Sequence, residues 1–188
     1  MTRIFAAATF VSLLATPLFA ASIERWIGNV TAITEPETHV GRVLFTADLS
    51  VPEEHVAVRR AYLRVPLPLF EASRAMTLRV HPVTTAWSRG AVGWTSGWSR
   101  AGGDFEDLVH GRAEIAAGGG GEAVFDITIL AKEILEHDVP NRGFILTIDP
   151  GEGVGVPAAD LEGLGALTGA TIDVSYRKTA PRPRRRQG

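Results

Sequence analysis

Apolar and polar residues alternate along most of the chain with the period of a β-strand. Between residues 76 and 81, for example, Met76, Leu78 and Val80 fall on one face and the polar residues fall on the other. A period of two with one polar face is typical of antiparallel sheets that cover a common core. Strands are predicted for seven runs rich in Val, Ile, Leu, Phe and Thr, at residues 24–33, 42–49, 56–67, 76–83, 122–127, 143–148 and 170–176.

Glycine and proline clusters separate these runs and mark the turns between strands. Pro52 precedes one run, glycines 118–121 precede another, and the sequence GEGVGVP from Gly151 follows a third. Seven or eight short strands with such punctuation predict an all-β fold, an antiparallel two-sheet sandwich or jelly roll.

One segment has helical rather than strand periodicity. In residues 126–138 the apolar residues Ile127, Leu130, Ile134 and Leu135 recur at helical spacing, and Asp126 or Thr128 is placed to cap the start. We therefore expect one short helix against an end of the sandwich, followed by a turn at residues 140–142.

The two ends of the chain have compositions of their own. Residues 1–20 place Arg3 before an apolar run and end in small residues, which is typical of a secretory signal peptide. No second apolar run follows, so no membrane span is expected after cleavage. We predict a signal peptide at 1–20, one β domain at 21–176 and a disordered basic tail at 177–188, in a protein that is secreted, periplasmic or bound at the cell surface.

Charge is separated between the domain and the tail. The tail contains six basic and no acidic residues, whereas residues 21–176 contain 12 basic and all 21 acidic residues. Two functions stay open for the tail: contact with an anionic surface or partner, or solubility alone. Nucleic acid is not expected as a partner, because the domain is acidic and has no basic surface interleaved with aromatic residues.

Several kinds of chemistry lack their sequence signatures. The chain has no cysteine, which excludes disulfides, thiolate metal ligands and cysteine nucleophiles. No zinc-protease HExxH motif or hydrolase elbow is present, and the five histidines are scattered. The protein is therefore not expected to be an enzyme, although a polysaccharide lyase or hydrolase site assembled by folding stays open as an alternative.

Three of the four tryptophans lie within residues 87–98. Trp87 and Trp94 are expected in the core at the end of the sandwich, because each adjoins strand-like sequence. Trp98 lies in a polar loop, where its indole could stack on a sugar ring while Arg100 binds a carboxylate. We predict a carbohydrate-binding site with Trp98 and Arg100, helped by the strand-face residues Arg64 and Arg79; the alternative for Trp98 is folding back over the domain.

An acidic cluster follows this stretch. Asp104, Glu106 and Asp107 supply hard oxygen ligands within four residues, and two preceding glycines allow a tight turn. A calcium site at these residues is one hypothesis. The alternative is a solvated acidic loop with no ion, since the spacing is not that of an EF-hand. No other cofactor is predicted.

The order of the segments resembles a known family. RVLFTADL, AYLRVPLP, LRVHPVTTAWSRGAVGWTSGW with AGGDF, AVFDITILAKEIL, NRGFILTI and GATIDVSY follow one another as the corresponding segments do in the extracellular DNRLRE domain family, also treated as carbohydrate-binding module family 96. The resemblance covers about residues 40–176. It implies a jelly roll, export and, as in some relatives, binding of polysaccharides such as alginate.

The chain departs from the family pattern at several positions. Residues 21–41 lack the segment that usually opens the domain, Arg89 stands where relatives often have an acidic residue, and Thr95 replaces an asparagine. We therefore expect an exported, non-catalytic module that binds an extracellular polysaccharide, with an acidic polysaccharide as one candidate. The main alternative is a structural or adhesive cell-envelope protein that contacts protein partners.

Overall fold

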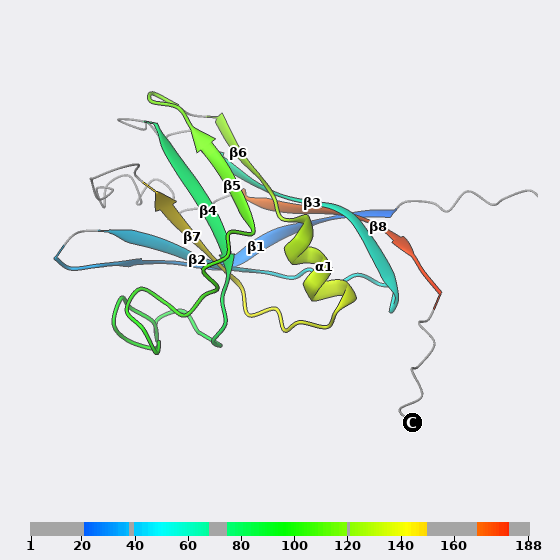
Figure 1. Cartoon of the computed structure of the whole chain (residues 1–188), viewed down its shortest axis with the longest axis horizontal. Coiled ribbons are helices and arrows are strands. Elements are labelled where there is room, and N and C mark those ends of the chain that lie inside the picture. Colours follow the sequence, from blue (N-terminus) through cyan, green and yellow to red (C-terminus); the bar gives the residue numbers. More distant parts are fainter. Residues whose placement is uncertain (1–20, 38–39, 68–74, 120, 150–168, 181–188) are drawn as a thin grey trace, which may run out of the picture.

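A computed structural model describes residues 21–37, 40–67, 75–119, 121–149 and 169–180 of the chain (Figure 1). The signal peptide predicted for residues 1–20 lies outside the described residues. Eight strands and one helix follow in the order β1 (Ala21–Thr34), β2 (Gly41–Ala47), β3 (Val56–Leu67), β4 (Met76–Pro82), β5 (Gly111–Ile115), β6 (Gly121–Asp126), α1 (Thr128–Glu136), β7 (Phe144–Asp149) and β8 (Thr171–Lys178).

The strands form one antiparallel sheet in the order β5-β4-β7-β2-β1-β8-β3-β6. The long strand β1 joins its two halves: residues Ala21–Trp26 pair with β8, and residues Ile27–Thr34 pair with β2. The prediction of an antiparallel β fold with one short helix is confirmed. The predicted division into two sheets is not clear, because hydrogen bonding continues through β1.

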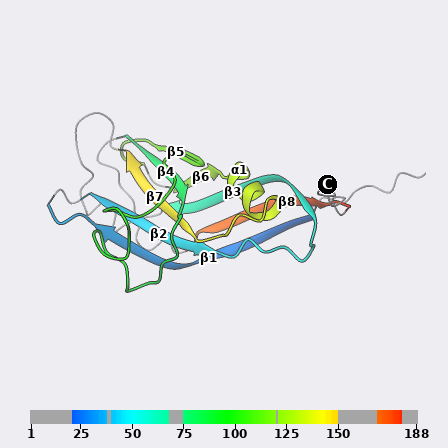
Figure 2. The ribbon, with the colours of Figure 1, turned by 60° about the horizontal axis from the view of Figure 1, so that its bottom comes forward.

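The sheet curls until its two end strands come close together, so that it is nearly closed into a barrel (Figures 1 and 2). Gly111 at the start of β5 lies against the end of β6, where a Cβ on this glycine would be 3.2 Å from the Cβ of Phe125. The two strands approach without forming a ladder, so close packing rather than hydrogen bonding joins the ends of the sheet.

The inward side chains of the strands fill the barrel. Met76, Leu78 and Val80 are buried, as the alternation in β4 predicts. Phe45 and Phe144 meet in the centre with ring centroids 5.3 Å apart. The alternation in the last strand also predicts a packing role for Tyr176, which is 2% exposed. The sequence periodicity therefore identifies the inner face correctly on these strands.

The helix α1 continues the edge of the sheet where β6 ends. Ala61 of β3 accepts a hydrogen bond from the Ile127 amide and donates its own amide to the Thr128 hydroxyl. Leu130 and Ala131 of the helix are buried in the main core. Asp126 accepts a hydrogen bond of 3.0 Å from the Thr128 amide, although the residue that precedes the helix is Ile127. The predicted helix is therefore present, and it covers the part of β3 that β6 does not reach (Figure 2).

Two details differ from the sequence prediction. The short strand β5 was not predicted, because the small residues Gly111 and Ala113 alternate with exposed charged residues and give a weak apolar signal. The last strand is longer than predicted: Arg177 and Lys178, assigned to the tail, pair with Ala57 and Val56 of β3. Residues 181–188 of the tail lie outside the described residues.

No helix in the described part of the chain is long and apolar enough to cross a membrane.

The two faces of β6 provide a test of the inward register. Phe125 is fully buried, whereas its neighbour Val124 is 39% exposed. Phe125→Ala should lower the free energy of unfolding by about 3–5 kcal/mol through lost burial and the cavity left behind. Val124→Ala, the control, should change it by less than about 0.5 kcal/mol. Urea unfolding measures both, and similar losses in the two variants would contradict the assigned register.

Candidate functional site

Residues 83–110, which we call the tryptophan loop, lie outside the barrel and cover part of its outer surface (Figure 1). Leu44 of β2 and Ile145 of β7 point outward and are fully buried beneath this loop. A second hydrophobic cluster results, formed by Ile33, Leu44, Val83 and Ile145 together with Trp87, Val92, Trp94, Trp98 and Phe105. Trp87 and Trp94 therefore pack in a hydrophobic cluster, as expected, but this cluster lies on the outer face of β2 and β7 and not in the main core.

Trp98 is half-buried in the same cluster. Its indole Nε1 donates a hydrogen bond of 2.8 Å to the carbonyl oxygen of Gly93 within the loop. The side chain thus folds back over the barrel, which is one of the two alternatives that the sequence left open. With the N–H occupied and the ring packed against the second cluster, Trp98 contributes to the stability of the loop.

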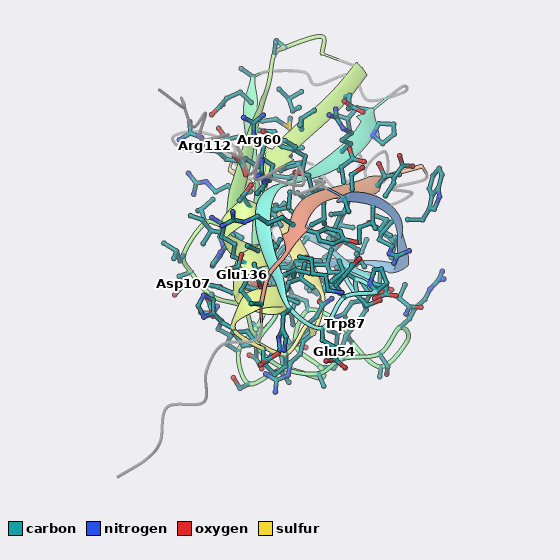
Figure 3. The ribbon with its side chains drawn as sticks, turned by 90° about the vertical axis from the view of Figure 1, so that its right-hand side faces the viewer. Glu54, Arg60, Trp87, Asp107, Arg112 and Glu136 are labelled. Carbon is teal, nitrogen blue, oxygen red and sulfur yellow. The ribbon has the colours of Figure 1, made fainter. Side chains whose placement is uncertain are left out.

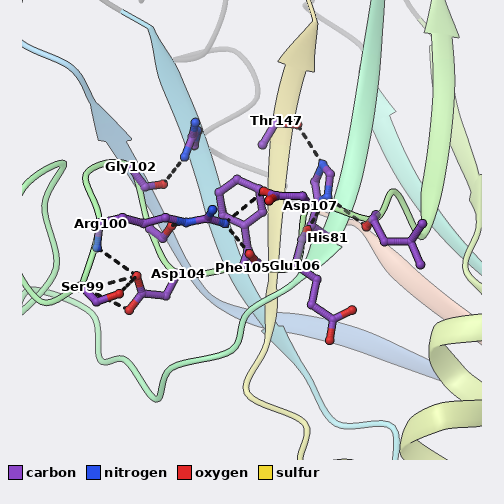
Figure 4. A network of polar contacts seen from close by, with 12 residues as sticks. His81, Ser99, Arg100, Gly102, Asp104, Phe105, Glu106, Asp107 and Thr147 are labelled. Atoms are coloured by element: carbon purple, nitrogen blue, oxygen red, sulfur yellow. Dashed lines mark hydrogen bonds and ion pairs between the residues drawn. The ribbon is translucent and has the colours of Figure 1, made fainter.

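Asp104 joins the start of the tryptophan loop to residues 99 and 100 within it (Figure 4). Its carboxylate accepts hydrogen bonds from the backbone amides of Ser99 and Arg100 and from the hydroxyls of Ser99 and Thr85, at 2.8–3.1 Å. Hydrogen bonds from the Ser99 amide above all, and then from these hydroxyls and Arg100, lower the pKa of Asp104 to about 2. The carboxylate is therefore charged and fully engaged at neutral pH.

Arg100 is committed to the same loop. Its guanidinium lies 4.5 Å from the centre of the Phe105 ring, donates to the carbonyls of Gly103 and Phe105, and lies 3.2 Å from a carboxylate oxygen of Asp107. The guanidinium of Arg42, on β2, donates a hydrogen bond to the carbonyl oxygen of Gly102 in the tryptophan loop. Burial is the main cause that lowers the pKa of Arg42, followed by the charge of Arg100. The geometry thus gives both guanidinium groups structural partners.

The three acidic residues of the calcium hypothesis point to different partners. Asp104 binds loop amides, Glu106 lies 3.2 Å from Nε2 of His110, and Asp107 meets Arg100. No group of three or more histidine or acidic side chains is placed to hold a metal ion within the residues that the structure describes. The arrangement gives the calcium hypothesis no support.

A buried histidine completes the attachment of the loop to β4. Nδ1 of His81 lies 2.9 Å from the Glu106 carbonyl and 3.2 Å from the Leu108 carbonyl, and therefore donates. Its Nε2 then accepts from the hydroxyl of Thr147 at 3.3 Å. Burial lowers the pKa of His81, which is consistent with this neutral tautomer. The histidine is thus a structural contact between loop and sheet.

The four residues of the predicted carbohydrate site do not come together. Trp98 and Arg100 lie in the tryptophan loop, while Arg79 lies on the outer face of β4, where it stands opposite Thr147 and Arg112. Arg64 is on β3, and the strands β7, β2, β1 and β8 separate it from Arg79 in the sheet. A single ligand site made from all four residues is therefore not formed.

The other half of the barrel has an outer surface that no described residue outside the sheet covers, and we call this surface of β1, β8, β3 and β6 the open face. Trp26 is 66% exposed on this face, which makes it one of the most exposed large apolar side chains of the described residues. It stands opposite Thr171, which in turn stands opposite Arg64. Tyr62 points outward two residues before Arg64 and is half-buried. The open face therefore presents two aromatic rings and a guanidinium.

The geometry of the strands places these rings at a useful separation. Trp26 on β1 and Tyr62 on β3 lie on opposite sides of β8, and the β8 residues that they face, Thr171 and Asp173, are two positions apart. Two strand spacings across the sheet and two residues along it separate their Cα atoms by roughly 10–12 Å. This spacing is comparable to the length of a disaccharide unit. Arg64 lies two residues from Tyr62 on β3 and forms salt bridges of 2.8 Å to Asp173 and 2.9 Å to Glu122, both of which are partly exposed.

Acidic side chains surround the aromatic pair. Glu24, Asp173, Tyr62 and Asp126 form one row across four strands. Carboxylates accept hydrogen bonds from hydroxyl groups, and they repel other anions. The face is thus better suited to a hydroxyl-rich neutral ligand than to an acidic one.

Trp26 and Tyr62 were not among the predicted site residues, although the sequence contains a signal for each. Trp26 shares a period-two register with Glu24, and Tyr62 shares one with Arg64, whereas the buried residues Leu63 and Val65 occupy the opposite register. A large aromatic residue on the polar register of a strand is expected on the surface. What the sequence did not provide is the strand order that brings the two side chains onto one face.

No protein-family model matches the chain, and no curated protein matches its sequence. The resemblance to the DNRLRE domain family therefore stays a prediction, and the function must be argued from the two outer surfaces.

The role of Asp104 predicts a response to acid. Because its folded-state pKa is lowered, its contribution to stability is present above about pH 4, the usual range of a carboxyl, and is lost as the pH falls towards about 2. Asp104→Asn removes the charge at any pH. We expect this variant to show red-shifted tryptophan emission already at pH 7, where the wild-type loop is intact.

Asp107→Asn is the matched control, because the Asp107 side chain is 84% exposed and makes one contact, with Arg100. Its emission at pH 7 should equal that of the wild type. Native emission and an unchanged acid profile in Asp104→Asn would contradict the anchoring role.

Proposed function

We propose that the protein is an exported, non-catalytic module that binds an extracellular polysaccharide on its open face. The observation that carries the proposal is Trp26, an indole left 66% exposed on a flat strand surface. An aromatic ring in this position is costly in water and can stack on the C–H surface of a pyranose ring. Tyr62 supplies a second ring for the same sugar chain.

Polar groups beside the rings support the same ligand. Arg64 offers N–H donors, while Glu24, two residues from Trp26 on β1, and Asp173, diagonal to Trp26 on β8, offer acceptors. Pockets that bind sugars combine apolar surface with a few placed polar groups. Since the carboxylates of Glu24, Asp126 and Asp173 outnumber the guanidinium of Arg64 beside the two rings, we propose a neutral glycan rather than an acidic one.

The fold and location belong to the same proposal. We infer a flattened, jelly-roll-like domain. The two halves of the sheet are hydrogen-bonded to each other through β1, whereas the end strands β5 and β6 are joined by side-chain packing. The predicted signal peptide supports export, to the medium, the periplasm or the cell surface. The basic tail supports contact with an anionic surface.

Affinity electrophoresis of residues 21–188 against a panel of neutral and acidic polysaccharides tests the proposal. We expect retardation by at least one neutral glycan, and Trp26→Ala should weaken it tenfold or more, because exposed tryptophans dominate such interfaces. Trp98→Ala tests the alternative site in the tryptophan loop. Trp94→Ala is its control, since both side chains belong to the second hydrophobic cluster.

The outcomes separate the proposed functions. Loss of retardation in Trp98→Ala but not in Trp26→Ala or Trp94→Ala would move the site to the tryptophan loop. No retardation by any glycan, with a stable protein complex recovered from the envelope, would favour the structural or adhesive function. Release of reducing or unsaturated ends from the panel would show a catalytic activity instead.

A further inference from the structure

A groove of about 580 Å³ lies at the end of the molecule where β3 begins and β8 ends, beside α1 (Figure 3). Four basic side chains from three elements line it: Arg59 and Arg60 from β3, Lys132 from α1 and Arg177 from β8. We call it the basic groove. Its volume is within the range of pockets that hold small ligands, about 300–1,000 Å³.

An irregularity in β3 supplies two of these side chains. Val58 stands opposite Tyr176 and Arg60 stands opposite Ser175, so Arg59 has no partner in the ladder and forms a β-bulge. In a regular strand, successive residues point to opposite faces, and one of two consecutive arginines would point into the core. The bulge leaves both Arg59 and Arg60 exposed, as bulges beside functional sites often do.

The bulge is held in place by the helix. Glu136 of α1 accepts a hydrogen bond of 2.7 Å from the Val58 amide, immediately before the bulge (Figure 3 labels Glu136 and Arg60). One oxygen of the only carboxylate in the lining is thus engaged by the backbone. Helix and strand are therefore fixed relative to each other, which fixes the distance between Lys132 and the two arginines.

The four cations lack partners of opposite charge. Among the described residues, no hydrogen bond or ion pair engages the side chains of Arg59, Arg60, Lys132 or Arg177. Elsewhere Arg42, Arg64, Arg100 and Arg112 each bind a carbonyl or a carboxylate. The groove therefore carries four cations and the one carboxylate of Glu136, and the cations in excess repel one another, which a multivalent anion would relieve.

We propose that the basic groove binds a phosphate group carried by an anionic ligand. A phosphate offers three or more acceptor oxygens and up to two negative charges, which matches basic donors that come from three elements of the fold. A carboxylate needs fewer donors, because one arginine that binds it through two N–H groups would satisfy it. Trp26 is not among the residues that line the groove, whereas Tyr62 lies two residues from Arg60 on the outer face of β3, so the groove adjoins the proposed glycan surface at that strand. The phosphate comes from a soluble phosphorylated molecule or from a lipid headgroup.

A neighbouring cavity limits the site to one side of the groove. This cavity, of about 700 Å³, shares Glu136 and Arg177 with the basic groove but also contains Glu54 and Asp138. Its carboxylates repel an anion. The phosphate is therefore expected on the side of Arg59, Arg60 and Lys132.

Two probes test the proposal with the chain from Ala21 to Gly188, so that the basic tail is constant in every sample. Inorganic pyrophosphate in calorimetry at 0.15 M salt represents a soluble ligand. Phosphatidylcholine vesicles with and without phosphatidylglycerol represent a lipid headgroup. The groove variant is Arg60→Gln with Lys132→Gln; the control is Arg89→Gln with Arg112→Gln, which removes two exposed charges elsewhere.

We expect at least tenfold weaker binding of pyrophosphate, of anionic vesicles or of both in the groove variant, and no more than a twofold change in the control. Arg59→Gln is a second groove variant, which should also weaken binding and serves as the test if the first variant is unstable. Trp26→Ala should leave phosphate binding unchanged, whatever its effect on glycans. Binding of pyrophosphate alone identifies a soluble phosphorylated molecule as the ligand, and binding of anionic vesicles alone identifies a lipid headgroup.

Two results would overturn the proposal. One is the absence of binding to either probe. The other is an equal loss in the groove and control variants, because this would show attraction by net charge rather than by the groove.

Discussion

Continuous hydrogen bonding through β1 is the constraint on which the rest of the molecule depends. This strand pairs with β8 over its first half and with β2 over its second half, so that one sheet curls around one main core. A curled sheet has an outer surface on both of its halves. The side chains that point outward from each half then decide what the surface can do.

The outer surfaces of the two halves of the sheet differ in whether a loop covers them. On β2 and β7 the outward residues Leu44 and Ile145 are apolar, and the tryptophan loop covers them. Asp104 stabilises this cover through charged hydrogen bonds, which are stronger than those between neutral groups. On β1 and β3 the outward residues include Trp26 and Arg64, and no such cover is present among the described residues. Three tryptophans are therefore structural, while the fourth is available to a ligand.

The half of the sheet that carries the open face has an acidic region and a basic region. Carboxylates such as Glu24 and Asp173 surround the aromatic pair, whereas Arg60 and Lys132 line the groove where β3 begins. A neutral sugar chain and a phosphate group thus fit different parts of the same half. The two regions adjoin along β3, where Arg60 lies two residues from Tyr62 on the same face.

The sequence predicted the local structure well and the candidate site poorly, for a physical reason. Period-two alternation identifies seven strands and the inward residues Leu78 and Tyr176, since burial on one face is a local property of each strand. Site geometry depends on strand order and on bulges, which join residues far apart in the chain. The polar neighbours of Trp98 leave stacking on a ligand and folding back over the domain both open, and the structure shows the second, with Trp98 packed against the second hydrophobic cluster. Trp26 was given no role, because its neighbours across β8 could not be known.

The central claim is that the open face, rather than the tryptophan loop, meets the ligand. The most direct measurement follows the four indole N–H signals by nuclear magnetic resonance during titration with a polysaccharide that retards the protein. The account predicts a shift of the Trp26 signal and constant Trp87, Trp94 and Trp98 signals, because the indoles of Trp87 and Trp98 already donate to Arg142 and Gly93. A shift of the Trp98 signal with a constant Trp26 signal would contradict it.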